Sequence, residues 1–217
     1  MKRPMIPFTR ASRERVPFGS SAIEIAVGRR QGDGQMPNRE FSKPTEAVRT
    51  VRQARVYHPE PVSADAVNEL LQVARWTGSS RNTQPWHFIV IDDGEQLRRI
   101  SELRTPINWV AGAPLGIALV LDGANPSSEG YDEGRVTERI LIAANMLGLG
   151  GGVAFYGDEA QQAEGKRILG IPSEKLARSV VIIGRPVTIK DPRPNRSQPG
   201  RKPLSEIVSH NRMGVTR

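Results

Sequence analysis

A polar loop at residues 78–86 carries the side chains most suited to holding a ligand. It reads Gly-Ser-Ser-Arg-Asn-Thr-Gln-Pro-Trp and lies between an expected helix and an expected strand. Its hydroxyls and amides offer many hydrogen-bond donors and acceptors, and such loops often bind ligands from a rigid scaffold. A solvated turn without a ligand has the same composition, so the loop by itself leaves both interpretations open.

Arginines near both ends of the chain are suited to binding a phosphate. Arg52 and Arg55 follow the first expected helix, and Arg201 and Lys202 lie in a proline-rich stretch near the C-terminus. The planar guanidinium binds phosphate through two parallel hydrogen bonds. Surface charge is the ordinary role of any one arginine. Two such clusters and an amide-rich loop together fit a planar, phosphorylated cofactor.

The sequence lacks the residues, or the residue spacing, that metal sites and dinucleotide-binding turns require. The chain has no cysteine, and its three histidines, His58, His87 and His210, are scattered rather than at metal-ligand spacing, so we expect no metal. The glycine-rich residues 148–152 follow a helix and precede a strand, which is the reverse of a dinucleotide-binding turn. We interpret these glycines as the end of the helix and a chain reversal.

The charge distribution argues against a nucleic-acid reader. The net charge is +8, but residues 1–50 carry +5 and residues 185–217 carry +6, which leaves −3 for the middle of the chain. A nucleic-acid-binding protein usually has a basic stripe on its folded domain. No apolar run approaches the length of a membrane helix. We therefore expect neither nucleic acid nor membrane as a partner, and the lack of cysteine fits a cytoplasmic protein.

Apolar spacing and turn residues predict alternating helices and strands. Ser63 is a suitable N-cap, and the helix beginning at Asp132 has the widest apolar face, so we place it across the centre of the domain. The expected helices cover residues 44–53, 63–78, 94–103, 132–147 and 158–169, and the expected strands cover 86–91, 114–121, 151–156 and 179–184. This order indicates helices covering a sheet, in an α+β or α/β fold.

Both ends of the chain differ from this pattern. Residues 1–43 contain four prolines and no sustained apolar period, so we expect a disordered basic tail and a domain over residues 44–217. From about residue 186 the chain is polar and proline-rich, which predicts an extended C-terminal arm rather than a central strand.

Five landmarks in the same order resemble the FMN-dependent nitroreductase family. Residues 51–57, Val-Arg-Gln-Ala-Arg-Val-Tyr, correspond to the family's Arg-Arg-Ser-Val-Arg-aromatic segment. Residues 78–88 correspond to its Pro-Ser-x-x-Asn-x-Gln-Pro-Trp-x-Phe. The other three landmarks are Ala-Ala-x-x-Leu-Gly-Leu-Gly at 143–150, the pair of segments at 169–172 and 183–186, and Arg-Lys-Pro-Leu at 201–204.

The resemblance implies an α+β, nitroreductase-like fold with a mixed sheet, a long central helix and a C-terminal arm around a partner. It also implies a homodimer with FMN at the subunit interface. The implied cofactor-binding residues are Arg52 and Arg201 at the phosphate, Gln53 beside them, Arg55 near the N1/O2 edge of the flavin, Ser79 and Asn82 at its pyrimidine end, and Ala154 and Phe155 along the ring.

The implied activity is a ping-pong, two-electron reduction. NAD(P)H would reduce FMN, and a small conjugated acceptor such as a nitroaromatic or quinone would reoxidise it. The flavin N5 carries the chemistry, so no side chain is a catalytic acid or base. A flavin storage or sensing protein, or a deiodinase-like or flavin-cleaving relative, are the alternatives.

The chain departs from the family pattern at several positions. Val51 replaces a common arginine, Gln53 a serine or threonine, and Gly78 a proline. Residues 103–113 leave little room for a substrate lid, and residues 123–130 are the other candidate.

Overall fold

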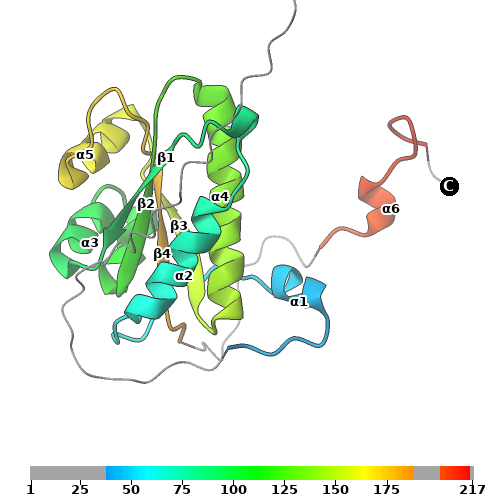
Figure 1. Ribbon diagram of the computed structural model, residues 1–217, viewed down its shortest axis with the longest axis horizontal. Helices are drawn as coiled ribbons and strands as arrows, with labels where there is room; N and C mark the ends of the chain where they lie inside the picture. Colours follow the sequence, from blue (N-terminus) through cyan, green and yellow to red (C-terminus); the bar gives the residue numbers. More distant parts are fainter. Residues whose placement is uncertain (1–37, 188–200, 216–217) are drawn as a thin grey trace, which may run out of the picture. The chain divides into compact units, whose positions relative to one another are not determined.

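A four-stranded sheet forms the centre of the domain (Figure 1). The computed structural model describes residues 38–187 and 201–215. The strands are β1 (Trp86–Ile91), β2 (Leu115–Leu121), β3 (Gly150–Phe155) and β4 (Ser179–Gly184), in the order β1-β2-β4-β3. This confirms the α+β class and places each expected strand within one residue of its predicted ends.

The strand directions differ from the mixed sheet that we expected. All three neighbouring pairs are antiparallel, with Ala118 of β2 opposite Ile89 on one side and Val180 on the other. Within the described residues, the parallel pairing is limited to one isolated bridge between Gln53 and Gly151. An apolar run indicates that a strand is buried but does not specify the direction of its neighbours.

Helices cover both faces of the sheet. The helices α2 (Ala64–Arg75) and α4 (Pro126–Met146) pack against one face, and α3 (Gly94–Ser101), the 3-10 helix η2 (Thr105–Gly112) and α5 (Glu159–Leu169) pack against the other. Alternate residues of β2 enter the two cores, with Ile117 facing α4 and Ala118 facing α3. All seven residues of β2 are buried, which explains its continuous apolar sequence.

The long helix α4 begins earlier than predicted. It starts at Pro126 instead of Asp132, because the Asn125 side chain accepts a hydrogen bond from the Ser128 amide and Pro126 occupies the first turn. The buried Glu129 carboxylate also accepts from the amides of Gly123 and Asn125. Most of the lid candidate at residues 123–130 is therefore the first turn of α4.

The first helix, by contrast, is shorter than predicted. The helix α1 (Pro44–Arg49) ends four residues before the expected Gln53, and Thr50 caps it through the Glu46 carbonyl. The chain beyond Thr50 is extended because its backbone pairs with β3. Helix α2 has the predicted N-cap, since the Ser63 hydroxyl accepts from the Ala66 amide, and it ends at Arg75 rather than at Gly78.

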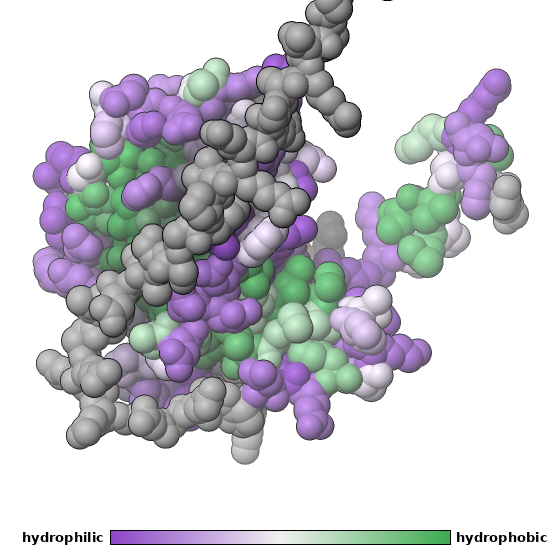
Figure 2. Space-filling view, in the orientation of Figure 1, coloured by the Kyte–Doolittle hydropathy of each residue, from purple (hydrophilic) through white to green (hydrophobic). Residues whose placement is uncertain are grey.

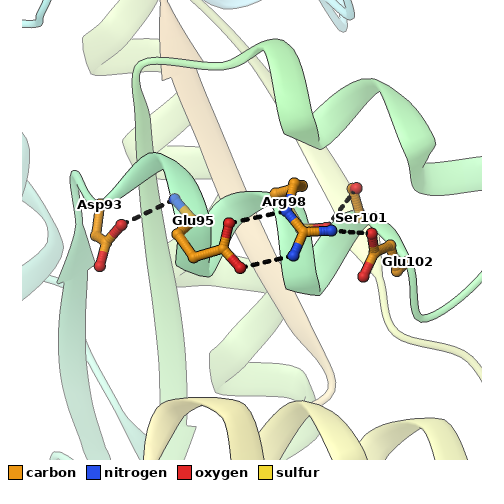
Figure 3. A network of polar contacts seen from close by, with 5 residues as sticks. All are labelled: Asp93, Glu95, Arg98, Ser101 and Glu102. Carbon is orange, nitrogen blue, oxygen red and sulfur yellow. Dashed lines mark hydrogen bonds and ion pairs between the residues drawn. The ribbon is translucent and has the colours of Figure 1, made fainter.

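The outer helices are stabilised by local polar contacts. Asp93 caps α3, and the Arg98 guanidinium pairs with Glu95 at 2.6 Å and with Glu102, all on an exposed face (Figure 3). In α5, Asp158 and Gln161 form a reciprocal capping box. The α3 network is local to its helix, whereas Gln161 also donates a 3.0 Å hydrogen bond to the Leu103 carbonyl and so joins α5 to the end of α3.

Most of the expected N-terminal tail and part of the expected C-terminal arm lie outside the described residues. Residues 1–37 and 188–200 are not described, whereas the Arg39 amide donates a 2.9 Å hydrogen bond to the Met146 carbonyl. Residues 201–215 contain a short helix that we did not predict, α6 (Leu204–Ile207). Figure 2 shows hydrophobic side chains uncovered on it, and Leu204 and Ile207 are 73% and 60% exposed.

Candidate functional site

Residues 51–57, which we call the edge segment, run beside the outer strand β3. Gln53 forms its parallel bridge with Gly151, and the Ala54 amide donates a 2.8 Å hydrogen bond to the Gly151 carbonyl. The Tyr57 hydroxyl donates to the Ala54 carbonyl at 2.7 Å, and burial raises the pKa of this tyrosine. The backbone is thereby fixed, while the side chains of Arg52, Gln53 and Arg55 remain exposed.

An open hollow of about 550 Å³ lies where the edge segment meets α1 and α4. Three of its lining residues are arginines, Arg49, Arg52 and Arg201, and Glu138 is its one acidic residue. The structure thus brings together Arg52 and Arg201, the two residues that the resemblance assigns to a phosphate. The remaining lining residues are Val48, Val51, Gln53 and Leu141.

Arg52 is held by the end of α1. Its Nη1 donates to the carbonyls of Arg49 and Val51 at 2.9 and 2.7 Å. Its Nε and Nη2 have no hydrogen bond to any described residue. Because a guanidinium has five N–H donors, this anchored side chain keeps donors available for an anion.

Arg55 lies at the other end of the edge segment, over an aromatic ring. Its guanidinium carbon is 5.9 Å from the Trp109 ring centroid. A Cβ added to Gly152 of β3 would lie 3.0 Å from Trp109 and 2.6 Å from the Ala54 carbonyl oxygen. We did not predict roles for Trp109 and Gly152. No sequence pattern marks them, because the contacts join η2, β3 and the edge segment.

Residues 78–84, which we call the amide loop, adopt an unusual backbone. Arg81, Asn82 and Gln84 have φ values of 52°, 58° and 49°, in the left-handed region that non-glycine residues rarely adopt. The Ser79 hydroxyl accepts a 2.8 Å hydrogen bond from the Gln84 amide and so closes the loop. Strained backbone of this kind is concentrated at functional sites, where the surrounding structure holds it in place.

The amide loop is anchored to the first half of α4. The Ser80 amide donates to the buried Asp132 carboxylate at 3.3 Å, and Arg135 lies 3.4 Å from the same carboxylate. Glu138, which lines the hollow, is six residues further along the helix, about 9 Å by the helical rise. Ser79 and Asn82 are not among the residues that line the hollow.

The two predicted residues of β3 have different environments. Ala154 is fully buried in the core, whereas Phe155 is 46% exposed. Side chains of successive strand residues point to opposite faces, so only Phe155 offers its side chain at this end of the strand. Ala154 could contact a ligand only through its backbone.

The described part of the chain contains neither a metal-binding cluster nor a membrane-spanning helix. No group of three or more His, Cys, Asp or Glu side chains is placed to hold a metal ion there. None of the described helices is both long and apolar enough to cross a bilayer.

Comparison with known sequences gives the family. Residues 48–122 match the model of the nitroreductase family. A relative from Archaeoglobus fulgidus, provisionally named NADH dehydrogenase/NAD(P)H nitroreductase, is 34% identical over 152 residues, which are 66% of this chain and 86% of the relative. A Methanothermobacter thermautotrophicus protein with the same provisional name is 30% identical over 145 residues, 65% of this chain and 76% of that protein.

Solved structures agree with this assignment. An FMN-dependent nitroreductase from Clostridium difficile R20291 superposes with a TM-score of 0.63 at 25% identity, covering 66% of this chain and 88% of its own. A provisionally assigned nitroreductase from Desulfovibrio desulfuricans, solved in complex with FMN, gives 0.66 at 26% identity, covering 79% and 99%. The chain therefore belongs to the nitroreductase family of oxidoreductases.

Proposed function

We propose that this protein is a homodimeric FMN-dependent oxidoreductase. It takes electrons from NAD(P)H and passes them, two at a time, to a small conjugated acceptor such as a nitroaromatic or a quinone. The observation that carries the proposal is the arginine-lined hollow beside the edge segment, where Arg52 and Arg201 meet although they are far apart in the sequence. The FMN-bound relative from Desulfovibrio desulfuricans supports the same cofactor.

The described residues fit FMN at its phosphate end. Arg52 presents unused guanidinium donors, and Arg201 lines the same hollow, so a dianionic phosphate would be bound by charge and by directed hydrogen bonds. Gln53, on the edge segment, would contact the ribityl part of FMN, which joins the phosphate to the flavin ring. FMN, when bound, supplies the two-electron chemistry.

The residues further along would bind the flavin ring. Arg55, steadied by Trp109, would place a positive charge where the reduced ring is negative. Phe155 and the Ala154 backbone would flank the ring at the end of β3, and Ser79 and Asn82 would hydrogen-bond its pyrimidine end. These residues orient the cofactor and exclude water, and none of them needs to act as an acid or base.

The family and the C-terminal residues support the homodimer. The family resemblance implies a site shared between two subunits, in which Ser79 and Asn82 of the amide loop would serve the cofactor of the other subunit. The C-terminal residues Leu204, Ile207 and Met213 are 73%, 60% and 98% exposed, as expected of an arm that packs on a partner. Sedimentation of the full chain tests this, since a monomer would contradict the shared site.

A spectroscopic titration tests the cofactor. Purified protein should show oxidised-flavin absorbance or gain it on addition of FMN, and a protein that does neither contradicts the proposal. Anaerobic mixing of the FMN complex with NADH or NADPH should then bleach the flavin within seconds. A flavin that stays oxidised would indicate a storage or sensing protein instead.

A further inference from the structure

Asn145, in the last turn of α4, directs three side-chain hydrogen bonds at the start of the domain. Its side chain is 8% exposed. Its Nδ2 donates to the Ala47 carbonyl at 2.8 Å and to the Thr50 hydroxyl at 3.1 Å, and its Oδ1 accepts from Arg39 Nη1 at 2.8 Å. Both amide donors and the carbonyl are therefore used.

These hydrogen bonds fix the end of α1. This helix has six residues, of which only Ala47 is buried, so it is too short to be stable without tertiary contacts. Its last carbonyls need partners. Those of Glu46, Val48 and Arg49 accept from Thr50, Val51 and Arg52 within the same stretch of chain, whereas that of Ala47 accepts from Asn145.

The same contact joins the two walls of the arginine-lined hollow. Arg49 and Arg52 line it from the end of α1 and the start of the edge segment, and Glu138 and Leu141 line it from α4. Asn145 lies one turn beyond Leu141 on α4 and ties that helix to the residues immediately before Val51.

We propose that Asn145 is a positioning residue for the phosphate end of the cofactor site, acting through α1 on Arg49 and Arg52. The inference rests on the proposed FMN function. Asn145 does not line the hollow, so it would act through its neighbours and not by direct contact with the phosphate. By fixing the distance between α1 and α4, it holds the arginines where a phosphate can use them, so its loss lowers the affinity for FMN through the phosphate alone.

A comparison of FMN with riboflavin, which lacks the phosphate, isolates this effect. Apoprotein is titrated with each flavin by fluorescence quenching. The dissociation constant for riboflavin divided by that for FMN then measures how much the phosphate contributes to binding. The Asn145→Leu variant keeps the branched shape of the side chain and removes all three hydrogen bonds. We expect its FMN affinity to fall about tenfold, the effect of losing one buried hydrogen bond, with riboflavin affinity unchanged within about twofold.

The matched control is Glu133→Gln on the same helix. Glu133 is also buried, but it bonds Arg178 at 2.9 Å and Ser179 at 3.1 Å, away from α1. This control should lower the melting temperature and leave the ratio at the wild-type value. If Asn145→Leu lowers only the melting temperature, as the control does, Asn145 is merely structural and the inference is wrong.

A milder variant covers the case in which Asn145→Leu does not fold. Thr50→Val keeps the shape of Thr50, removes one acceptor of Asn145 and removes the hydroxyl's own hydrogen bond to the Glu46 carbonyl, which the Thr50 amide still bonds. The ratio of the riboflavin to the FMN dissociation constant should fall by about threefold. An unchanged ratio in that variant overturns the inference. Failure of the wild-type chain to bind FMN overturns the proposed function itself, and this result is distinct because it appears before any variant is made.

Discussion

The edge segment and the amide loop both belong to the proposed cofactor site, but different forces shape them. The edge segment is held by backbone pairing with β3 and by the buried Tyr57. The amide loop has no strand partner and is held by its own Ser79–Gln84 hydrogen bond and by Asp132. The first is part of the sheet, and the second is a local structure attached to a helix.

Because of this difference, substitutions in the edge segment and in the amide loop should affect the stability of the fold and the binding of the ligand differently. A change that displaces the edge segment disturbs the sheet edge and the cofactor site together. A change in the exposed side chains of the amide loop should remove only the proposed ligand contacts and leave the core unaffected. Substitutions at four positions test this contrast and the parts of the site around it, from the largest expected effect to the smallest.

Gly152→Val should have the largest effect. An added Cβ would lie 2.6 Å from the Ala54 carbonyl oxygen and 3.0 Å from Trp109, so the edge segment must move away from β3. Overpacking of this kind costs about 3 kcal/mol of unfolding free energy, and FMN binding should be lost with it. Denaturant unfolding and flavin titration measure both effects.

The control for this variant is Gly94→Ala in α3. An added Cβ there has no atom within 4 Å, so both properties should be preserved. If Gly152→Val keeps wild-type affinity for FMN, the edge segment does not form the site.

Arg201→Ala should weaken FMN binding by about 1.5–3 kcal/mol, the range for a charge-assisted hydrogen bond. Riboflavin binding should be unchanged, because only the phosphate contact is removed. Arg212→Ala, another exposed arginine of the C-terminal residues, is the control and should have no effect on either flavin. Equal affinities for FMN in all three proteins would mean that the phosphate lies elsewhere.

Two substitutions at Asn82 distinguish the contribution of its side-chain amide to flavin binding from the effect of its backbone conformation on stability. Asn82→Gly and Asn82→Ala both remove the amide, so each should weaken FMN and riboflavin alike by about 1–2 kcal/mol. Alanine must also adopt a φ of 58°, which costs about 1 kcal/mol of stability that glycine avoids. Calorimetry of both variants measures this difference, and equal stabilities would show that the loop relaxes to another conformation.

The smallest effect concerns pH and the start of α1. The Ser42 hydroxyl and amide donate to Glu46 at 2.8 and 2.9 Å, and these hydrogen bonds hold the pKa of Glu46 below its usual 4.5. A carboxyl with a lowered pKa stabilises the fold above its unfolded-state pKa, and this contribution is lost as the pH falls through the folded-state value. The melting temperatures of wild type and Glu46→Gln should therefore differ near neutral pH and converge in acid. A difference that is constant with pH would contradict this role.

The sequence by itself determined most of the elements and the family. Short, mainly apolar runs bounded by polar or turn residues predicted β1 and β4 with their observed ends. Ser63 was predicted as the N-cap of α2, and the start of α5 was predicted at Asp158, which caps it. These signals are local, since a buried strand or a capped helix end depends on neighbouring residues. The start of α4 was also readable, because Asn125 followed by Pro126 is a helix-start pattern.

Only the tertiary structure decided where the site residues meet. We predicted that the first helix continues to Gln53, yet the chain after Thr50 leaves the helix and pairs at Gln53 with the edge of β3. Arg52 and Arg201 line one hollow although 148 residues separate them. On α4, Asp132 in the first half anchors the amide loop, and Asn145 in the last turn anchors the end of α1 just before the edge segment. Such contacts depend on how the elements pack against one another, and no local pattern of residues encodes that packing.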